Sequence, residues 1–196
     1  MNQVKAIIGL GNPGADYAAT RHNAGAWLVQ AVARAAGDEL RPEKKFLGLH
    51  AKVQMGGQEV HLLEPTTFMN RSGGAVAALC QFFKLAPDEL LVAHDELDMP
   101  PGTARYKTGG GHGGHNGLRD ITSALGGDNG FHRLRIGIGH PGDSRQVTHY
   151  VLGRPGKAEL AAIDDAIDEC LATLPQAMAG DWAKAMNRLH SFTAPS

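Results

Sequence analysis

Cysteine is scarce in this chain of 196 residues, which contains only Cys80 and Cys170. Both lie far apart within apolar patterns of helical spacing, so we expect two buried thiols rather than a disulfide, a metal pair or a nucleophile. Long hydrophobic runs are absent too: no window approaches the roughly 18 apolar residues of a membrane span, and the first residues do not resemble a signal peptide. We therefore expect a cytoplasmic protein that makes no membrane contact.

Familiar motifs of nucleophilic and metal catalysis are also missing. The sequence has no G-x-S-x-G, no H-E-x-x-H and no cysteine cluster. His112 and His115 flank two glycines, but a glycine-rich loop holds metal ligands poorly and no third ligand accompanies them. A metal-dependent hydrolase therefore ranks last among the functions that we consider.

The composition, with 42% apolar and 20% charged residues, is typical of a globular protein. Short apolar runs predict strands at residues 4–10, 49–55, 59–64, 89–95, 103–107 and 133–139, with a hairpin turn at Gly56-Gly57. Helical spacing predicts helices at 26–37, 72–83, 118–125, from 157 onward, and after Pro175 to about 190. Because strands alternate with helices, we predict one domain over residues 1–196, an α/β three-layer fold with a mixed twisted β-sheet flanked by helices.

The stretch GLGNPG places Gly9, Gly11 and Gly14 in the G-x-G-x-x-G pattern of dinucleotide-binding proteins. Its surroundings do not fit that class, because Pro13 interrupts the segment and no apolar second strand ending in an acid follows the first helix. We interpret the stretch as a strand-to-loop turn that projects Asn12 from the carboxyl end of the first strand. Ligands of α/β proteins bind at such ends.

His22 stands in the polar stretch TRHNAG, just before a predicted helix. A loop or capping role is the ordinary interpretation of a single histidine, but an oriented histidine is also the side chain best suited to proton transfer near neutral pH. Asp95 ends a predicted strand and could orient such a ring by accepting a hydrogen bond from one of its nitrogens. Glu96 and Asp98 are alternative partners that we expect to be solvated.

Two further asparagines stand at predicted helix starts. Asn70 belongs to PTTFMNRSG, and Asn116 closes the glycine-rich stretch GGGHGGHNG at residues 109–117. Helix capping is the alternative role for both residues. The glycine-rich stretch lacks the Lys-Ser/Thr ending of a phosphate-binding loop. We interpret it as a flexible lip that positions Asn116, with His115 at the rim of the site and His112 facing solvent.

Charge is distributed unevenly along a chain whose net charge is −1. Between Thr103 and Arg154 there are seven basic and three acidic residues. A local basic surface of this kind can bind a polyanion, although a solvated face is an equally good interpretation of charge alone.

Taken together, these stretches resemble the bacterial peptidyl-tRNA hydrolase family. GLGNPG, TRHNAG, PTTFMNRSG, HDELDMPPG, GGGHGGHNGLRDI and FHRLRIGIGHPG occur in that family's order and spacing, and the similarity extends to NRLHSF. The resemblance implies a monomeric α/β enzyme, with no metal and no cofactor, that acts on peptidyl-tRNA. Such an enzyme hydrolyses the ester between the peptide and the 3′-terminal ribose, which releases the tRNA for reuse in translation.

The resemblance also implies roles for individual residues. His22 would be the general base on the attacking water, and Asp95 would orient and stabilise it. Asn12, Asn70 and Asn116 would line the site, with Asn12 distinguishing a blocked aminoacyl group from a free one.

Further positions of the resemblance concern the tRNA. Tyr17 and Phe68 match positions that contact the tRNA end, and Lys107 and Arg135 match a basic pair that binds the 5′-phosphate. His115 would belong to the same substrate-binding surface. The alternative is a non-catalytic RNA-binding protein on the same fold, for which the basic segment would matter and the histidine would not.

Overall fold

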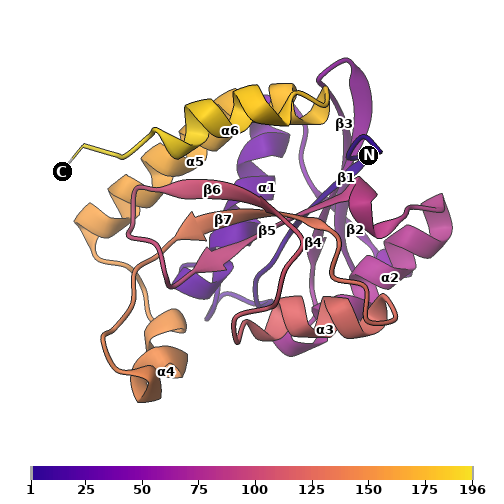
Figure 1. Cartoon of the computed structure of the whole chain (residues 1–196). Helices are drawn as coiled ribbons and strands as arrows, with labels where there is room; N and C mark the ends of the chain where they lie inside the picture. The colour runs from indigo at the N-terminus through magenta and orange to yellow at the C-terminus, as the bar shows by residue number, and fades with distance from the viewer. Residues whose placement is uncertain (1, 196) are drawn as a thin grey trace.

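A mixed β-sheet runs through the centre of this computed structural model, which describes residues 2–195 (Figure 1). Within those residues the sheet has seven strands in the order β2-β3-β4-β1-β5-β7-β6. The strands are β1 (Ala6–Gly9), β2 (Arg41–Glu43), β3 (Gly48–Met55), β4 (Gln58–Pro65), β5 (Leu90–Glu96), β6 (Ala104–Thr108) and β7 (His132–Gly137). Strands β4, β1, β5 and β7 are parallel, whereas β2, β3 and β6 pair antiparallel with their neighbours. The prediction of a mixed sheet is confirmed.

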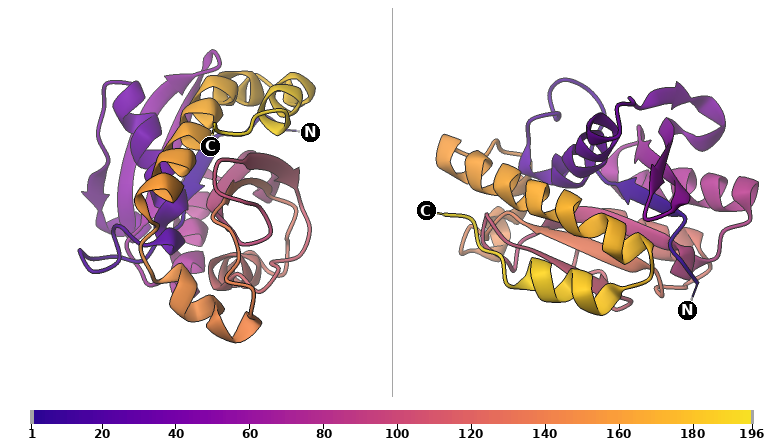
Figure 2. Two further views of the ribbon diagram at one scale, coloured as in Figure 1. Left: turned by 90° about the vertical axis from the view of Figure 1, so that its left-hand side faces the viewer. Right: turned by 90° about the horizontal axis from the view of Figure 1, so that it is seen from above.

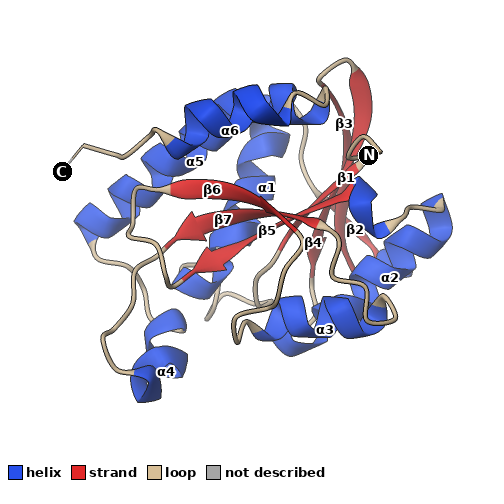
Figure 3. Ribbon diagram, viewed as in Figure 1, coloured by secondary structure: helices blue, strands red, loops and turns tan. Residues whose placement is uncertain are grey.

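Helices cover both faces of the sheet, as Figure 3 shows. They are α1 (Ala24–Ala35), α2 (Ser72–Phe83), α3 (Asn116–Ala124), α4 (Val147–Val151), α5 (Lys157–Met178) and α6 (Trp182–His190). Helices α1, α5 and α6 contribute to one apolar core cluster, and α2 and α3 contribute to the other. Seen from above, α5 and α6 run side by side across their face (Figure 2). The predicted three-layer α/β fold is therefore confirmed, and none of the described helices is long and apolar enough to cross a membrane.

Most predicted elements form where the sequence pattern placed them. Strands β1 and β5 are almost wholly buried, as expected for parallel strands covered on both faces. The hairpin β3–β4 turns at Gly56 and Gly57, which both have positive φ angles of 60° and 78°. That conformation is the one that matches the twist of the paired strands.

Three features of the fold differ from the sequence prediction. The predicted helix break at Pro175 is wrong, because α5 continues to Met178 and the chain turns at Gly180, whose φ is +91°. Pro175 has no N–H to donate to the carbonyl four residues earlier, so α5 lacks one hydrogen bond near its end but continues for three more residues. Strand β2 was missed because this short, exposed edge strand has no apolar pattern, and the five-residue helix α4 is too short for a periodic signal.

Two glycines bring α1 close to the strands that carry the site. A side chain at Gly25 would collide with the Ala93 carbonyl of β5, and one at Gly9 would collide with the Gly25 carbonyl and with Val29. Only glycine permits this approach of helix to strand. Because His22 lies two residues before α1 and Asp95 two residues after Ala93 on β5, the close packing places the two side chains beside each other.

Candidate active site

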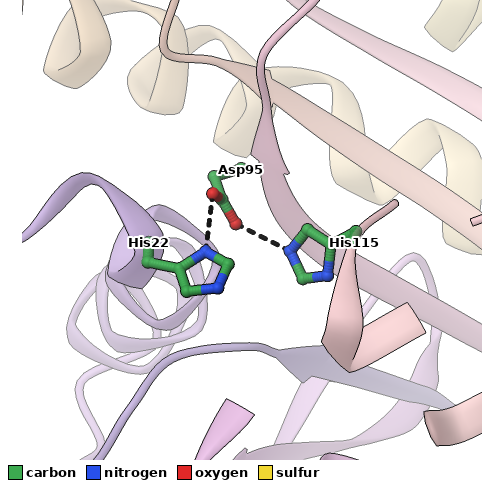
Figure 4. A group of neighbouring side chains, drawn as sticks. All are labelled: His22, Asp95 and His115. Atoms are coloured by element: carbon green, nitrogen blue, oxygen red, sulfur yellow. Dashed lines mark hydrogen bonds and ion pairs between the residues drawn. The ribbon is translucent and has the colours of Figure 1, made fainter. Parts of the chain in front are cut away.

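Three side chains from separate segments meet at Asp95, near the carboxyl end of β5 (Figure 4). His22 comes from a short 3-10 segment before α1, Asp95 from the end of β5, and His115 from the residue before α3. His22 Nδ1 lies 2.8 Å from one oxygen of the Asp95 carboxylate. His115 Nε2 lies 2.8 Å from the other oxygen. The carboxylate therefore binds two imidazoles at once.

Asp95 is an ionised carboxylate in a buried position. Its side chain is 2% exposed. Burial alone would raise the pKa of Asp95, but the adjacent His22 and His115 and their hydrogen bonds hold that pKa well below its usual range. The negative charge is thus fixed between the two rings.

The His22 ring is oriented by this charge. Since Nδ1–H donates to Asp95, the unprotonated nitrogen of the neutral ring is Nε2, which points away from the carboxylate (Figure 4). Burial lowers the pKa of His22, but the charge and hydrogen bond of Asp95 outweigh it and raise the pKa above its ordinary value of 6.5. An oriented nitrogen with a raised pKa is a better proton acceptor than a free imidazole.

His115 is bound in the opposite tautomer. Its Nδ1 accepts hydrogen bonds from the backbone N–H groups of Gly117 and Leu118, at 3.1 and 3.3 Å. This nitrogen carries no proton, so Nε2–H is the group that donates to Asp95. The expectation that His115 lies at the rim is wrong, because its side chain, which is only 9% exposed, binds Asp95 and caps the N-terminus of α3. The cap of α3 is therefore His115, and the alternative capping role of Asn116 is also wrong.

These hydrogen bonds argue against a metal centre. Donor atoms of His22, Asp95 and His115 lie within 4.8 Å of one another, which is close enough to surround an ion. His22 Nδ1 and His115 Nε2, however, carry the protons that are donated to the Asp95 carboxylate. His115 Nε2 could ligate a metal only if its proton moved to Nδ1, which faces two N–H donors.

Asn12 is held with its amide nitrogen free. Asn23 fixes its backbone, because Asn23 Oδ1 accepts from the Asn12 N–H at 2.8 Å and Asn23 Nδ2 donates to the Asn12 carbonyl at 3.0 Å. The Asn12 side-chain oxygen accepts from the Met69 N–H at 2.7 Å. Its Nδ2 group has no hydrogen-bond partner among residues 2–195 and belongs to the wall of the central cleft.

The cleft has a volume of about 1100 Å³. Nine of the ten predicted site residues line it: Asn12, His22, Phe68, Asn70, Asp95, Lys107, His115, Asn116 and Arg135. Tyr17 does not, but its ring packs edge-on against Phe68, with the ring centroids 6.1 Å apart.

Asn70 caps no helix, and Asn116 Oδ1 accepts a hydrogen bond from Arg119 at 3.1 Å. His112, expected in solvent, is half-buried in the cleft wall.

Four basic side chains lie on one face of the β6–β7 pair. Lys107 lies opposite Arg133 and Arg105 opposite Arg135, so all four side chains lie on the same face of the two strands. Like charges directly across a strand pair are destabilising. Their presence beside a cleft fits a site for a polyanion.

Several residues that hold the site together carry no distinguishing signal in the sequence. Asn23 and Met69 position Asn12, although nothing in the motifs around them indicates that role. His94 donates from Nδ1 to the Asp95 carbonyl at 2.8 Å, and burial lowers its pKa to about 3. Its place beside Asp95 in the strand is the one available signal. Arg133 looks in the sequence like any other cation of the basic segment.

The fold and the site together define a hydrolase of the α/β class in which a buried carboxylate orients a histidine toward a large, partly basic cleft. The family model described as peptidyl-tRNA hydrolase matches residues 6–196. The chain belongs to the peptidyl-tRNA hydrolase family.

Individual relatives agree with this membership. The peptidyl-tRNA hydrolase of Chromohalobacter salexigens is 74% identical over 194 residues, which is 99% of this chain and 100% of that protein. The peptidyl-tRNA hydrolase of Pseudomonas aeruginosa is 59% identical over 194 residues, again 99% and 100% of the two chains. The crystal structure of peptidyl-tRNA hydrolase from Acinetobacter baumannii superimposes with a TM-score of 0.94 at 47% identity and covers 98% of this chain and 97% of that one.

The effect of the Asp95 charge on the His22 ring can be tested without a substrate. Asp95→Asn removes the charge that favours the His22 imidazolium but leaves the ring buried, so the His22 pKa should fall below 6.5. An NMR titration of the His22 ring protons measures it. Asp98→Asn, which removes an exposed charge three residues further along the chain, just after β5, serves as the control. An equal His22 pKa in the wild type and in Asp95→Asn would show that the carboxylate does not set the basicity of the ring.

Proposed function

We propose that this chain hydrolyses the ester between a peptide and the 3′-terminal ribose of tRNA, with His22 as general base. The observation that carries the proposal is the His22 ring, held by Asp95 with Nε2 unprotonated at the wall of the cleft. An ester is already an activated acyl group, so an oriented water, a base and a hydrogen-bond donor suffice for its cleavage. Membership of the family supports the same reaction.

The reaction begins with removal of a proton from water by His22 Nε2. The resulting hydroxide attacks the ester carbonyl carbon and forms a tetrahedral intermediate with a negatively charged oxygen. When the bond to the ribose oxygen breaks, the His22 imidazolium returns its proton to that oxygen. The products are a peptide carboxylic acid, which then ionises by releasing its proton to solvent, and a tRNA with a free 3′-hydroxyl. Asp95 remains ionised throughout and stabilises the transient imidazolium.

Asn12 supplies the specificity in this proposal. Its free Nδ2 group can donate to the carbonyl of the first peptide bond. A substrate with a free α-amino group lacks that carbonyl and would leave the amide of Asn12 without a partner. Asn70 and Asn116, which line both the cleft and a smaller pocket next to it, can bind the remaining polar groups of the terminal nucleotide and peptide.

The tRNA would lie across two chemically different parts of the surface. Phe68 is 54% exposed and offers an aromatic face for the terminal base, with Tyr17 packed against its edge. Lys107 and Arg135 would bind the 5′-phosphate from the basic face of β6 and β7. We propose that the chain acts as a monomer, since one copy supplies the residues of the site. We also propose that it acts in the cytoplasm, as expected for a family that returns tRNA to translation.

The alternative, a non-catalytic RNA-binding protein, would need the basic face but not the histidine. The hydrogen-bonded His22–Asp95 pair favours the enzyme, because a buried charge and an oriented base have no use in simple RNA binding.

His22→Ala should lower turnover by a factor on the order of 10² to 10⁴ while leaving tRNA affinity nearly unchanged, because only the base is lost. Release of a labelled N-acetyl-aminoacyl group from tRNA measures turnover. His149→Ala, an exposed histidine outside the cleft lining, is the matched control. Full activity of His22→Ala would overturn the proposed role, and loss of wild-type activity on adding a chelator would indicate metal catalysis instead.

Lys107→Ala and Arg135→Ala should each raise KM for 5′-phosphorylated tRNA and reduce the slope of log KM against log salt by about one. Wild-type enzyme with dephosphorylated tRNA should behave like the variants, because the same contact is missing. Lys52→Ala, a lysine paired with Glu59 on the β3–β4 hairpin, controls for general loss of charge. An unchanged salt slope in both cleft variants would exclude a phosphate site at these residues.

A further inference from the structure

Arg133 is a fully buried cation, 2% exposed, and is the second residue of β7. Its guanidinium donates from Nη1 to the Gly111 carbonyl at 2.5 Å and from Nη2 to the Gly110 carbonyl at 2.5 Å. A weaker bond joins Nη2 to the Asn129 carbonyl at 3.3 Å, and the group lies 4.5 Å above the centre of the Phe131 ring. The planar fork of arginine thus spans two successive carbonyls of the glycine-rich loop.

No carboxylate pairs with this charge among residues 2–195. Burial and the neighbouring charge of Arg135 lower the pKa of Arg133 below its ordinary value. A buried charge that lacks a counter-ion is costly unless its hydrogen bonds are needed in that place. The residues that Arg133 binds therefore indicate its purpose.

The glycine-rich loop, residues 109–114, has little else to hold it. Gly109, Gly110, Gly113 and Gly114 have positive φ angles, which glycine adopts readily, but fixing a glycine in one conformation costs more entropy than fixing any other residue. Three sets of hydrogen bonds in the described chain join this loop to the rest of the protein: the Arg133 contacts, the Gly109 N–H, which donates to the Phe131 carbonyl at 3.0 Å, and the His115 N–H, which donates to the His112 carbonyl at 2.9 Å. Residues 110–114 have no apolar side chain with which to pack.

The loop leads directly into the site. The residue after Gly114 is His115, whose ring binds Asp95, and the next is Asn116 in the cleft wall. The loop is thus attached at one end by Arg133 and at the other by His115. A shift of about 1 Å in such a support can cost on the order of 10²-fold in rate.

We propose that Arg133 is a positioning residue, which holds the glycine-rich loop so that His115 reaches Asp95 and Asn116 reaches the substrate. Its task differs from that of Arg135, two residues along the same strand face, which has no hydrogen bond to the loop. The kinetic part of this inference rests on the proposed function, whereas the structural part, restraint of the loop, does not.

The test compares Arg133→Gln and Arg133→Lys. Hydrogen exchange of the amides of residues 110–115 reports the loop directly. Kinetics on an N-acetyl-aminoacyl ester of the trinucleotide CCA, which carries no 5′ end of the acceptor stem, separate loop positioning from phosphate binding. Both variants should exchange faster in the loop and lose about tenfold in kcat on this short ester, with little change in KM. Arg133→Lys should restore neither the slow amide exchange of the loop nor kcat, because one ammonium group cannot donate to two carbonyls in the planar geometry of a guanidinium.

Arg41→Gln is the matched control, since it removes one arginine charge from β2, at the edge of the sheet opposite β6 and β7 and outside the cleft lining. Its loop exchange and kcat should equal those of the wild type. The proposal is overturned if Arg133→Lys retains wild-type exchange and kcat, because charge alone would then suffice. It is also overturned if Arg133→Gln only raises KM for full-length tRNA.

The outcomes separate this inference from the proposed function. A wild-type protein that releases nothing from tRNA or from the short ester would refute the enzymatic function, whereas the exchange measurement would still test the restraint of the loop. Should Arg133→Gln fail to fold, Arg133→Lys, which keeps the charge and most of the side-chain stem, carries the comparison.

Discussion

The buried Asp95 carboxylate accepts one hydrogen bond from His22 and one from His115, and three segments far apart in the sequence converge on it. Its charge raises the pKa of His22 and fixes which His22 nitrogen carries the proton. The same charge binds the ring that caps α3, so it also determines where Asn116 begins its helix. Base, helix start and cleft wall are therefore coupled through a single anion.

The rest of the fold can be understood as support for this contact. Glycines at positions 9 and 25 let α1 pack closely against β1 and β5, which brings His22 within hydrogen-bond distance of Asp95. The reciprocal bonds between Asn12 and Asn23 join the β1 loop to the segment that carries His22. Farther away, Arg133 restrains the loop that carries His115. Each support acts on a different one of the segments that meet at the site.

Much of this arrangement could be predicted from the sequence. Apolar runs indicated the buried strands, and His22 and Asp95 were identified because their residue types and their places beside predicted elements suit proton transfer. The part that could not be predicted is the choice of hydrogen-bond partner. Whether His115 lies at a rim or binds Asp95 depends on how α3 packs, and no local pattern specifies that. Likewise, a count of charges treats Arg133 and Arg135 as equivalent, although only Arg133 binds the loop. Elements without periodicity, such as β2 and α4, were missed for the same reason, since pairing and packing form them rather than local pattern.

The most direct test of the central claim is the position of the protons on the two rings. Nitrogen NMR of the histidine side chains, recorded above the pKa of His22, distinguishes Nδ1–H from Nε2–H. The shared carboxylate requires opposite tautomers, with His22 protonated at Nδ1 and His115 protonated at Nε2. A His22 ring protonated at Nε2 would leave no lone pair on the nitrogen that faces away from Asp95, and it would contradict a base oriented by that carboxylate.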